Sequence, residues 1–420
     1  MKTGYIINNK YIGVCQLGKG TFSEVWLCLQ YEYRDYVAVK IFTDNDVAEH
    51  ELEMIELIKK NNAPNCLTYI EKFYYKNMLY IVQPLMAGSV YDIMKAQYPH
   101  GLPLASVKKI MYDVSRALEY LHGTLKVMHT DIKPENILLS GYTINVNNII
   151  IEINKCLDAL GKHASIETIA RNIKKKLNID VDMTNNDISE SEMGTEFTDR
   201  ENSSDNTIDT ASDIHSEHTS KIDQSFLDSF DDYSELNNAE TLERQNMINI
   251  MDDKYIMDPH VLLGDFGNSI LIKNSSEFGD LQTRHYRSPE IILRFKSDEK
   301  SDIWAIGCTF YELVTNKVLF NPFKSPGVTT DRQHLNDIQC IVGSFPNFLK
   351  HSRKQDVFFR TDGTIKSINS FNYVGIDNIL SENCYLKKED HEYILNTLLK
   401  LLDYDVSNRP SASECIKLFM

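Results

Sequence analysis

The run His129-Thr130-Asp131-Ile132-Lys133-Pro134-Glu135-Asn136 is a polar stretch enclosed by apolar residues, Val127-Met128 before it and Ile137-Leu138-Leu139 after it. The apolar flanks are typical of buried segments, so they would hold the polar run as a short, rigid loop. Within six positions this loop carries a carboxylate, an ammonium group and an amide. Phosphoryl transfer needs these groups, as a base to orient a hydroxyl, a cation for the moving phosphoryl group and an oxygen ligand for magnesium. The loop therefore predicts Asp131 and Lys133 as catalytic residues and Asn136 as a metal ligand.

A glycine-containing turn near the N-terminus predicts a phosphate-binding loop. It follows the β-prone run Tyr11-Ile12-Gly13-Val14. Glycines let backbone amides approach phosphate oxygens with no side chain in the way. Ser23 stands where such loops usually carry a third glycine, so a plain hairpin turn is an equal alternative for this segment taken alone. The residues expected to contact ATP here are Gly18, Lys19, Gly20, Thr21, Phe22, Ser23 and Val25.

A lysine follows at the end of the next apolar strand, Val37-Ala38-Val39-Lys40. A lone lysine at a strand end is usually solvated, but this one lies at a hairpin's distance from the glycine turn. We expect Lys40 to reach the α- and β-phosphates of ATP and Ala38 to contact the nucleotide. In the charged helix predicted from Val47 to Lys60, Glu53 is the carboxylate expected to pair with Lys40, because it shares a face with Leu57 four residues later. We expect the other acids of this helix, Glu49, Glu51 and Glu56, to be solvated.

Two further segments complete the predicted site. The apolar run from Leu79 to Met86 predicts a buried strand that leads into the connector between two lobes, with an ordinary strand end as the alternative. Pro84 has no amide hydrogen but keeps its carbonyl, which can accept from the adenine amino group; the expected ATP contacts are Gln83, Pro84 and Met86. Far along the chain, Asp265 in Gly264-Asp265-Phe266-Gly267-Asn268 is expected to be the second ligand of magnesium.

In this order the motifs resemble those of protein kinases, with Thr130 where most catalytic loops carry arginine. The resemblance is greatest to the SR-protein kinases, which phosphorylate serines in arginine-serine repeats. Three features carry it: the His-Thr-Asp loop, Asn268 directly after Asp-Phe-Gly with the run Gln282 to Ser288 behind it, and a long insertion between Asn136 and Asp265. The resemblance implies an α+β, bilobal protein-kinase fold, with a small antiparallel β lobe carrying one helix and a larger, mainly helical lobe. It also implies ATP and Mg²⁺ as cofactors and transfer of the γ-phosphoryl group to serine or threonine of protein substrates, with arginine-serine-rich splicing factors as candidates.

The resemblance also implies structural roles for residues outside the catalytic loop. Glu290 would form a buried ion pair with Arg409, and Asp302 would cap the backbone amides of the catalytic loop. We expect Phe266 to pack between the glutamate-bearing helix and the core, and His129 to support the Asp-Phe-Gly turn.

The predicted domain boundaries follow the motifs. Residues 1–86 form the N-lobe, 87–145 the first part of the C-lobe, 146–254 an acidic, largely disordered spacer, and 255–420 the rest of the C-lobe. Residues 181–260 carry 21 acidic and 4 basic side chains, a net charge of −17, so the net charge of −16 is local to them and the rest of the chain nets +1. Such a polar tract cannot pack a core. Before it, Val146 to Leu177 has apolar residues at helical spacing and predicts one or two helices, either a satellite pair or a dock onto the kinase or a partner.

Composition excludes several classes of protein. The 420 residues, 42% of them hydrophobic, suffice for two lobes with separate cores. Eight cysteines without paired spacing predict reduced thiols rather than a disulfide framework or a zinc site. No apolar run approaches membrane-spanning length, and we expect no direct contact with nucleic acid. We expect a monomer of the cytoplasm, the nucleus or both, whose partners are its protein substrates.

Substrate choice and regulation can also be argued from the sequence. Matched to the SR-protein kinases, the acids of their substrate groove fall on Lys317, Gln333 and Cys340, none of which is acidic, although Asp331 and Asp337 lie close enough to compensate in part. Thr130 cannot clamp a phosphorylated activation loop as arginine does, so we expect activity without phosphorylation of that loop. The alternatives are a Clk-like or dual-specificity kinase, a pseudokinase scaffold and a kinase of small molecules.

Overall fold

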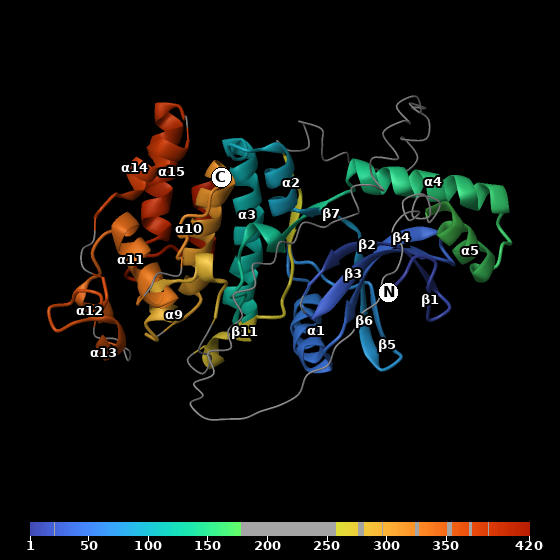
Figure 1. The fold of residues 1–420 in the computed structure, drawn as a ribbon, viewed down its shortest axis with the longest axis horizontal. Coiled ribbons are helices and arrows are strands. Elements are labelled where there is room, and N and C mark those ends of the chain that lie inside the picture. The colour runs from blue at the N-terminus through green and yellow to red at the C-terminus, as the bar shows by residue number, and fades with distance from the viewer. Residues whose placement is uncertain are drawn as a thin grey trace, which may run out of the picture. The chain divides into compact units, whose positions relative to one another are not determined.

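The computed structural model describes residues 1–20, 22–177, 258–275, 281–295, 297–323, 327–350, 355–368, 372–384 and 386–420. The described residues fall into two compact units: 1–36 with 150–177 form the first, and the others form the second. Figure 1 gives the elements of both. Most of the predicted acidic spacer, residues 178–254, lies outside the described residues.

The first unit is a small antiparallel sheet with a helix pair packed on it. Its strands are β1 (Ile6–Ile7), β2 (Tyr11–Lys19) and β3 (Ser23–Gln30), with β2 paired to both others. Helix α4 (Ile144–Leu160) enters the unit at Ile150, and α5 (Ile166–Leu177) packs against β1 and β2 (Figure 1). The buried face of α5 consists of Ile166, Ile169, Ala170, Ile173 and Leu177, the helical spacing that the sequence shows. The helix prediction for this stretch is thereby confirmed.

Polar side chains fasten the helix pair to the first unit. The guanidinium of Arg34 donates to the carbonyl of Gly161 at 2.6 Å, just beyond the end of α4. The hydroxyl of Tyr31 donates to the carbonyl of Ala164 at 3.1 Å, in the α4–α5 connection. Since α5 also buries its apolar face on the sheet, the pair is an integral part of this unit rather than a satellite.

The second unit begins with antiparallel strands and one long helix. Strand β6 (Met78–Pro84) pairs with β4 (Asp35–Phe42) on one side and with β5 (Glu71–Tyr75) on the other. Helix α1 (Asn45–Lys60) follows β4; its N-cap Asp44 accepts hydrogen bonds from the amides of Asp46 and Val47. The inward face of α1 carries Ala48, Leu52, Ile55 and Ile58.

The rest of the second unit is mainly helical. Helix α10 (Lys300–Thr315) is buried along nearly its whole length and contacts α3 (Leu104–Tyr120) and α15 (Lys388–Leu401), as Figure 1 shows. A Cβ added at Gly307 would lie 2.8 Å from the Leu402 side chain, so a larger residue here would have to displace that side chain at the end of α15. The remaining helices are α2 (Val90–Gln97), α9 (Pro289–Ile292), α11 (Thr330–Val342), α12 (Asn347–Lys350), α13 (Gln355–Phe358), α14 (Ile376–Asn383) and α16 (Ala412–Phe419), with short helical turns η1 (Leu121–Leu125), η2 (Pro134–Asn136), η4 (Ile272–Asn274) and η5 (Arg284–Tyr286).

Two small sheets position the catalytic loop. Strands β8 (Val127–Met128) and β9 (Ile137–Ser140) flank the loop, as its apolar borders predict. Strand β9 lies between β7 (Met86–Ser89) and β10 (Val261–Leu263), and β8 pairs with β11 (Ile270–Leu271). Because β10 and β11 enclose Asp265, these pairings bring two polar loops together that are distant in sequence. The α+β class, with an antiparallel N-terminal part and a mainly helical C-terminal part, is confirmed.

Candidate active site

An ion pair holds Lys40 in place, and its partner differs from the predicted one. The Nζ atom of Lys40 lies 2.6 Å and 2.8 Å from the two carboxylate oxygens of Glu51, which is 3% exposed. The predicted partner, Glu53, is exposed, so that prediction was wrong. Successive residues turn by about 100° around a helix, which places Glu53 on the side of α1 opposite Glu51. Its spacing to Leu57 showed that the two share a face, but not that this face points inward.

Asp265 joins this pair from the second loop. Its Oδ1 atom lies 3.6 Å from Nζ of Lys40, and its side chain is 46% exposed. The nearby ammonium of Lys40 holds the pKa of Asp265 below its usual range, against the opposing effect of burial. Burial lowers the pKa of Lys40, but Glu51 and Asp265 outweigh it and raise that pKa above its usual value. Lys40 therefore stays cationic and Asp265 anionic at neutral pH.

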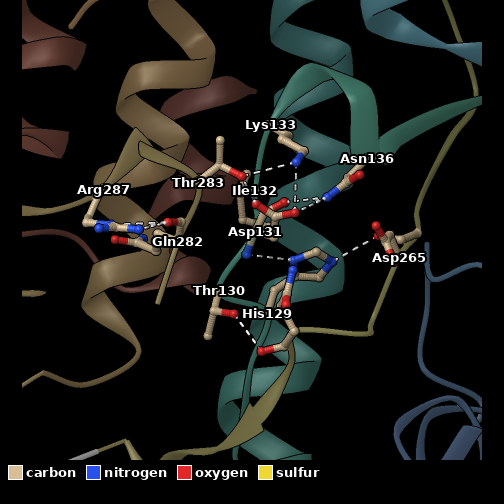
Figure 2. Close-up of polar contacts among 12 residues, drawn as sticks. His129, Thr130, Asp131, Ile132, Lys133, Asn136, Asp265, Gln282, Thr283 and Arg287 are labelled. Atoms are coloured by element: carbon tan, nitrogen blue, oxygen red, sulfur yellow. Dashed lines mark hydrogen bonds and ion pairs between the residues drawn. The ribbon is translucent and has the colours of Figure 1, made fainter. Parts of the chain in front are cut away.

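The backbone of the catalytic loop is held by Asp302 at the start of α10. The amides of His129 and Thr130 each donate to its carboxylate at 2.8 Å, and the carboxylate is fully buried. This confirms the predicted capping role. Thr130 has φ = 65°, a conformation rare for a β-branched residue. Its hydroxyl donates to the carbonyl of Asn268 at 2.7 Å, which ties the loop to the segment after Asp-Phe-Gly (Figure 2).

The Asp131 carboxylate lies among the polar groups of Lys133, Asn136 and Thr283 (Figure 2). Lys133 Nζ lies 2.9 Å from Oδ2 of Asp131, and Asn136 Nδ2 donates to the same oxygen at 3.0 Å. The hydroxyl of Thr283 donates to Oδ1 at 2.5 Å and accepts from Lys133 at 3.1 Å. Thr283 was not among the predicted site residues. It does head the run that follows the activation loop, Thr283 to Glu290, which is the only sign of it in the sequence.

The oxygens of Asn136 and Asp265 fit a magnesium ion. Because Nδ2 of Asn136 faces Asp131, where it also donates to the backbone carbonyl at 2.8 Å, the Oδ1 atom is left for a metal. His129 Nε2 contacts the carbonyl of Gly264 at 3.0 Å, and its ring packs on buried Phe266. His129 therefore contacts the residues on both sides of Asp265 and supports the Asp-Phe-Gly turn, as predicted. The described residues contain no cluster of three or more histidine, cysteine or acidic ligands. One carboxylate and one amide oxygen suit Mg²⁺, which completes its shell with water and substrate phosphates.

The predicted ATP contacts lie in both units. In the first unit, Gly18 and Lys19 end β2, Ser23 and Val25 lie on β3, and the amide of Gly20 donates to the carbonyl of Ser23 at 2.7 Å. Phe22 at this tip is 50% exposed, and Thr21 lies outside the described residues. In the second unit, Ala38 on β4 pairs with Gln83 on β6; Pro84 ends β6, and Met86 begins β7. Their contacts with nucleotide remain predictions.

The residues that the sequence argument assigns to the substrate groove make contacts of their own. Lys317 donates to the side-chain oxygen of Asn383 at 2.6 Å, and Gln333 donates to Asp337 at 2.8 Å. Asp331 pairs with Arg284 at 2.7 Å, so its charge is already neutralised. Burial raises the pKa of Asp337 to about 6, so its carboxylate keeps most of its negative charge at pH 7 and loses it below about pH 6.

The activation segment is anchored by groups that need no phosphate. The side chain of Gln282 donates to the carbonyl of Ser301 and accepts from the amide of Ser288, both at 2.8 Å. Arg287 donates to the carbonyl of Gln282 at 2.9 Å (Figure 2). Farther on, Arg409 meets Glu290 through two hydrogen bonds of 2.6 Å and 2.8 Å, with both side chains fully buried, which confirms the predicted ion pair.

Comparison with known proteins agrees with this geometry. Residues 11–150 and 246–419 match the family described as protein kinase domain, so the chain belongs to the protein kinases. The interruption in the match falls within the predicted spacer. None of the described helices is long and apolar enough to cross a membrane.

Similar proteins narrow the class. The chain is 29% identical to a serine/threonine-protein kinase of Acanthamoeba polyphaga mimivirus, 25% to serine/threonine-protein kinase SRPK of Physarum polycephalum, and 23% to SRSF protein kinase 3 of Mus musculus. Each comparison covers 99% of this chain and 87% of the relative. The protein is a serine/threonine protein kinase of the SRPK-like type, as its motifs indicate.

Proposed function

We propose that this kinase transfers the γ-phosphoryl group of ATP to serine or threonine hydroxyls of protein substrates, with Asp131 as the acceptor of the hydroxyl proton. The observation that carries the proposal is the contact of one buried carboxylate with Lys133, Asn136 and Thr283. Contacts to both oxygens of the Asp131 carboxylate fix its orientation. A substrate hydroxyl that approaches Asp131 therefore meets an acceptor that is already in position. Such positioned groups lower the barrier without covalent chemistry by the protein.

The charge and position of the other site residues indicate how each would bind ATP or magnesium. Lys133, held between Asp131 and Thr283, would stabilise the phosphoryl group during transfer. Lys40, cationic and anchored by Glu51, would hold the α- and β-phosphates. Asn136 and Asp265 would hold Mg²⁺, and the bound ion would neutralise charge on the phosphate oxygens. Because these catalytic groups come from one chain, a monomer suffices; we propose the cytoplasm or the nucleus as its compartment.

Arginine-serine-rich proteins remain a candidate substrate class through the resemblance to SR-protein kinases. The groove positions argue against docking of long arginine-rich segments, because Lys317 has reversed charge and Asp331 is neutralised by Arg284. A guanidinium gains little from such a surface. We therefore propose protein substrates that need no repeated arginine-serine tract for docking.

Phosphate transfer to two peptides tests the proposal. One peptide carries arginine-serine repeats, and the other is basic but lacks repeats; Asp131→Asn and Asp265→Ala serve as inactive controls. We expect the wild-type enzyme to use both peptides with comparable kcat/KM. A strong preference for the repeat would show that docking does not need the groove acids. Absence of transfer to either peptide would favour a scaffold role.

A further inference from the structure

The outer side of helix α5 carries basic side chains that have no acidic partner among the described residues. Arg171, Lys174 and Lys175 are exposed and lie three and four residues apart, so they share one side of the helix. The neighbouring Lys176 is engaged, because it pairs with Glu152 of α4 at 2.9 Å. No acidic side chain in the described ranges lies within ion-pair distance of the other three. We call Arg171, Lys174 and Lys175 the basic face.

The opposite side of α5 is already used by the fold. The helix packs against β1 and β2, and its buried residues are Ile166, Ile169, Ala170, Ile173 and Leu177. Lys174 borders this contact, because a Cβ added at Gly4 would lie 2.9 Å from Cβ of Lys174. A basic amphipathic helix binds a membrane surface by burying its apolar side in lipid, and here that side is covered by the sheet. The basic face therefore offers charge alone, which suits a solvated anionic partner.

The sequence places such a partner next to the basic face. Residues 1–36 and 150–177 of the first unit carry 10 Lys and Arg side chains against 6 Asp and Glu, a net charge of +4. The described part of this unit ends at Leu177. Residues 180–192, which lie outside the described residues, carry no basic side chain and five acids, Asp180, Asp182, Asp187, Glu190 and Glu192. A run of five negative charges therefore begins three positions after the end of α5.

A segment attached this closely can reach the whole basic face. The 12 residues of α5 span about 18 Å at 1.5 Å per residue. An extended chain covers that length in about five or six residues, at 3.3–3.6 Å each. Residues 180–192 are therefore long enough to turn back along α5. Attachment to the same chain also gives the segment an effective concentration on the order of millimolar, which makes weak contacts count.

We propose that the basic face of α5 is a docking site for residues 180–192 of the same chain. The guanidinium of Arg171 can hold a carboxylate through two parallel hydrogen bonds, and Lys174 and Lys175 add point charges. Nucleic acid or another anionic molecule has to displace the attached segment and also meets the charge of −17 on residues 181–260. Docking ties the acidic segment to the sheet whose strand β2 ends in the predicted phosphate-binding loop. The inference does not depend on the proposed function.

Carbodiimide coupling of the 420-residue chain tests the proposal, because this reagent joins an ammonium and a carboxylate that are in contact. Peptide mapping then identifies the linked residues. Links to Asp187, Glu190 and Glu192 are decisive, since these acids are too far along the chain to be linked through sequence adjacency. We expect them to couple to Lys174 and Lys175 at low salt. In 1 M salt, where the Debye length is about 3 Å, the yield should fall about 3- to 100-fold.

Two controls separate docking from the general behaviour of helix-end lysines. Lys60 and Lys400 are exposed lysines in the last turns of α1 and α15, and we expect no salt-sensitive links from them to residues 187–192. Arg171→Gln keeps both coupling lysines and removes one cation of the basic face, so it should lower the yield about 2- to 5-fold. The matched change Arg116→Gln, at an exposed arginine of α3, should leave the yield unchanged.

Each other result would overturn the proposal. Equal coupling to Lys60 and Lys400, or a yield that does not respond to Arg171→Gln and to salt, would show that the segment has no preferred site. A mixture of isotopically heavy and light chains detects a second copy, and links found only between heavy and light chains would assign the basic face to that copy. Absence of these links, with Lys174 and Lys175 shielded from acetylation by an added DNA duplex, would assign it to nucleic acid.

Discussion

The ion pair between Lys40 and Glu51 gives a direct test of which acid on α1 serves the phosphate-binding lysine. Removing one partner of a buried pair leaves the other charge uncompensated, so Glu51→Gln should lower kcat/KM for ATP by about 10- to 100-fold. Glu53→Gln, two residues away on the exposed side, should stay within about twofold of the wild type. Steady-state kinetics with varied ATP decides between them. A larger effect at Glu53 would mean that α1 is rotated in the working enzyme.

Glu312 predicts a pH-dependent change in stability. Its pKa of about 7 in the folded protein lies above the ordinary value of 4.5, so the folded state binds the proton more tightly than the unfolded state. Stability from this group is therefore present below about pH 4.5 and is lost as the pH rises through 7, by up to roughly 3 kcal/mol. Glu312→Gln stays neutral and can still accept from Tyr286. We expect it to be more stable than the wild type at pH 8, with a much smaller difference at pH 5.

Chemical unfolding at both pH values measures this difference. Glu119→Gln, on the exposed face of α3, serves as the control and should show no such trend. A variant that is less stable than the wild type at pH 8 would show that the carboxylate is satisfied in the folded protein.

Single residues also show which parts of the site could be predicted from the sequence and which could not. The placement of Asp131, Lys133 and Asn136 could be predicted because they share one short loop, and that of Asp265 because it follows a recognisable strand; their roles stay predictions. The Glu51 pairing could not, because spacing along a helix gives its faces but not which of them meets a given strand. Thr283 was missed because a threonine hydroxyl has no distinctive pattern. Its role appears only when the activation segment brings it to Asp131.

The activation segment is the element for which regulation can be predicted. Gln282, Arg287 and the Thr130–Asn268 contact hold it through uncharged backbone acceptors. Phosphatase treatment of the purified enzyme should therefore leave kcat within about twofold. Gln282→Ala removes two buried hydrogen bonds and should lower kcat much more than a control change at exposed Glu119. Peptide phosphorylation before and after phosphatase treatment gives the result, and a large loss of rate would show that a phosphate is required.

The helix pair α4–α5 shows what periodicity can and cannot predict for an element. Apolar residues at helical spacing predicted both helices from the sequence. Their attachment to the first unit depends on Tyr31 and Arg34, polar residues more than 100 positions away in sequence, which meet backbone carbonyls of the pair. Such contacts carry no periodic signal, so a satellite pair and a docked pair could not be distinguished before the structure.

The negative charge of the whole chain is confined to one segment, and the other residues together are nearly neutral. Residues 181–260 hold a net charge of −17, and all other residues together hold +1, which gives −16 for the entire chain. The chain outside residues 181–260 is therefore nearly neutral and would not attract basic substrates over long range. Selection of a basic substrate then has to come from short-range contacts close to the catalytic loop.

Distant parts of the second unit are joined by the buried pair of Glu290 and Arg409, which are 119 positions apart in sequence. Arg409 also donates to the carbonyl of Asp403 at 2.6 Å and lies 5.0 Å from the centre of the Trp304 ring. Glu290→Gln leaves the guanidinium buried without a counter-charge, so we expect a loss of about 3–5 kcal/mol in the free energy of unfolding. The double variant Glu290→Gln with Arg409→Met removes both charges and should recover part of that loss. Denaturant unfolding of the three proteins measures both values; a double variant no more stable than Glu290→Gln would show that the contacts of Arg409 with Asp403 and Trp304, rather than its charge pair, hold this end of the chain.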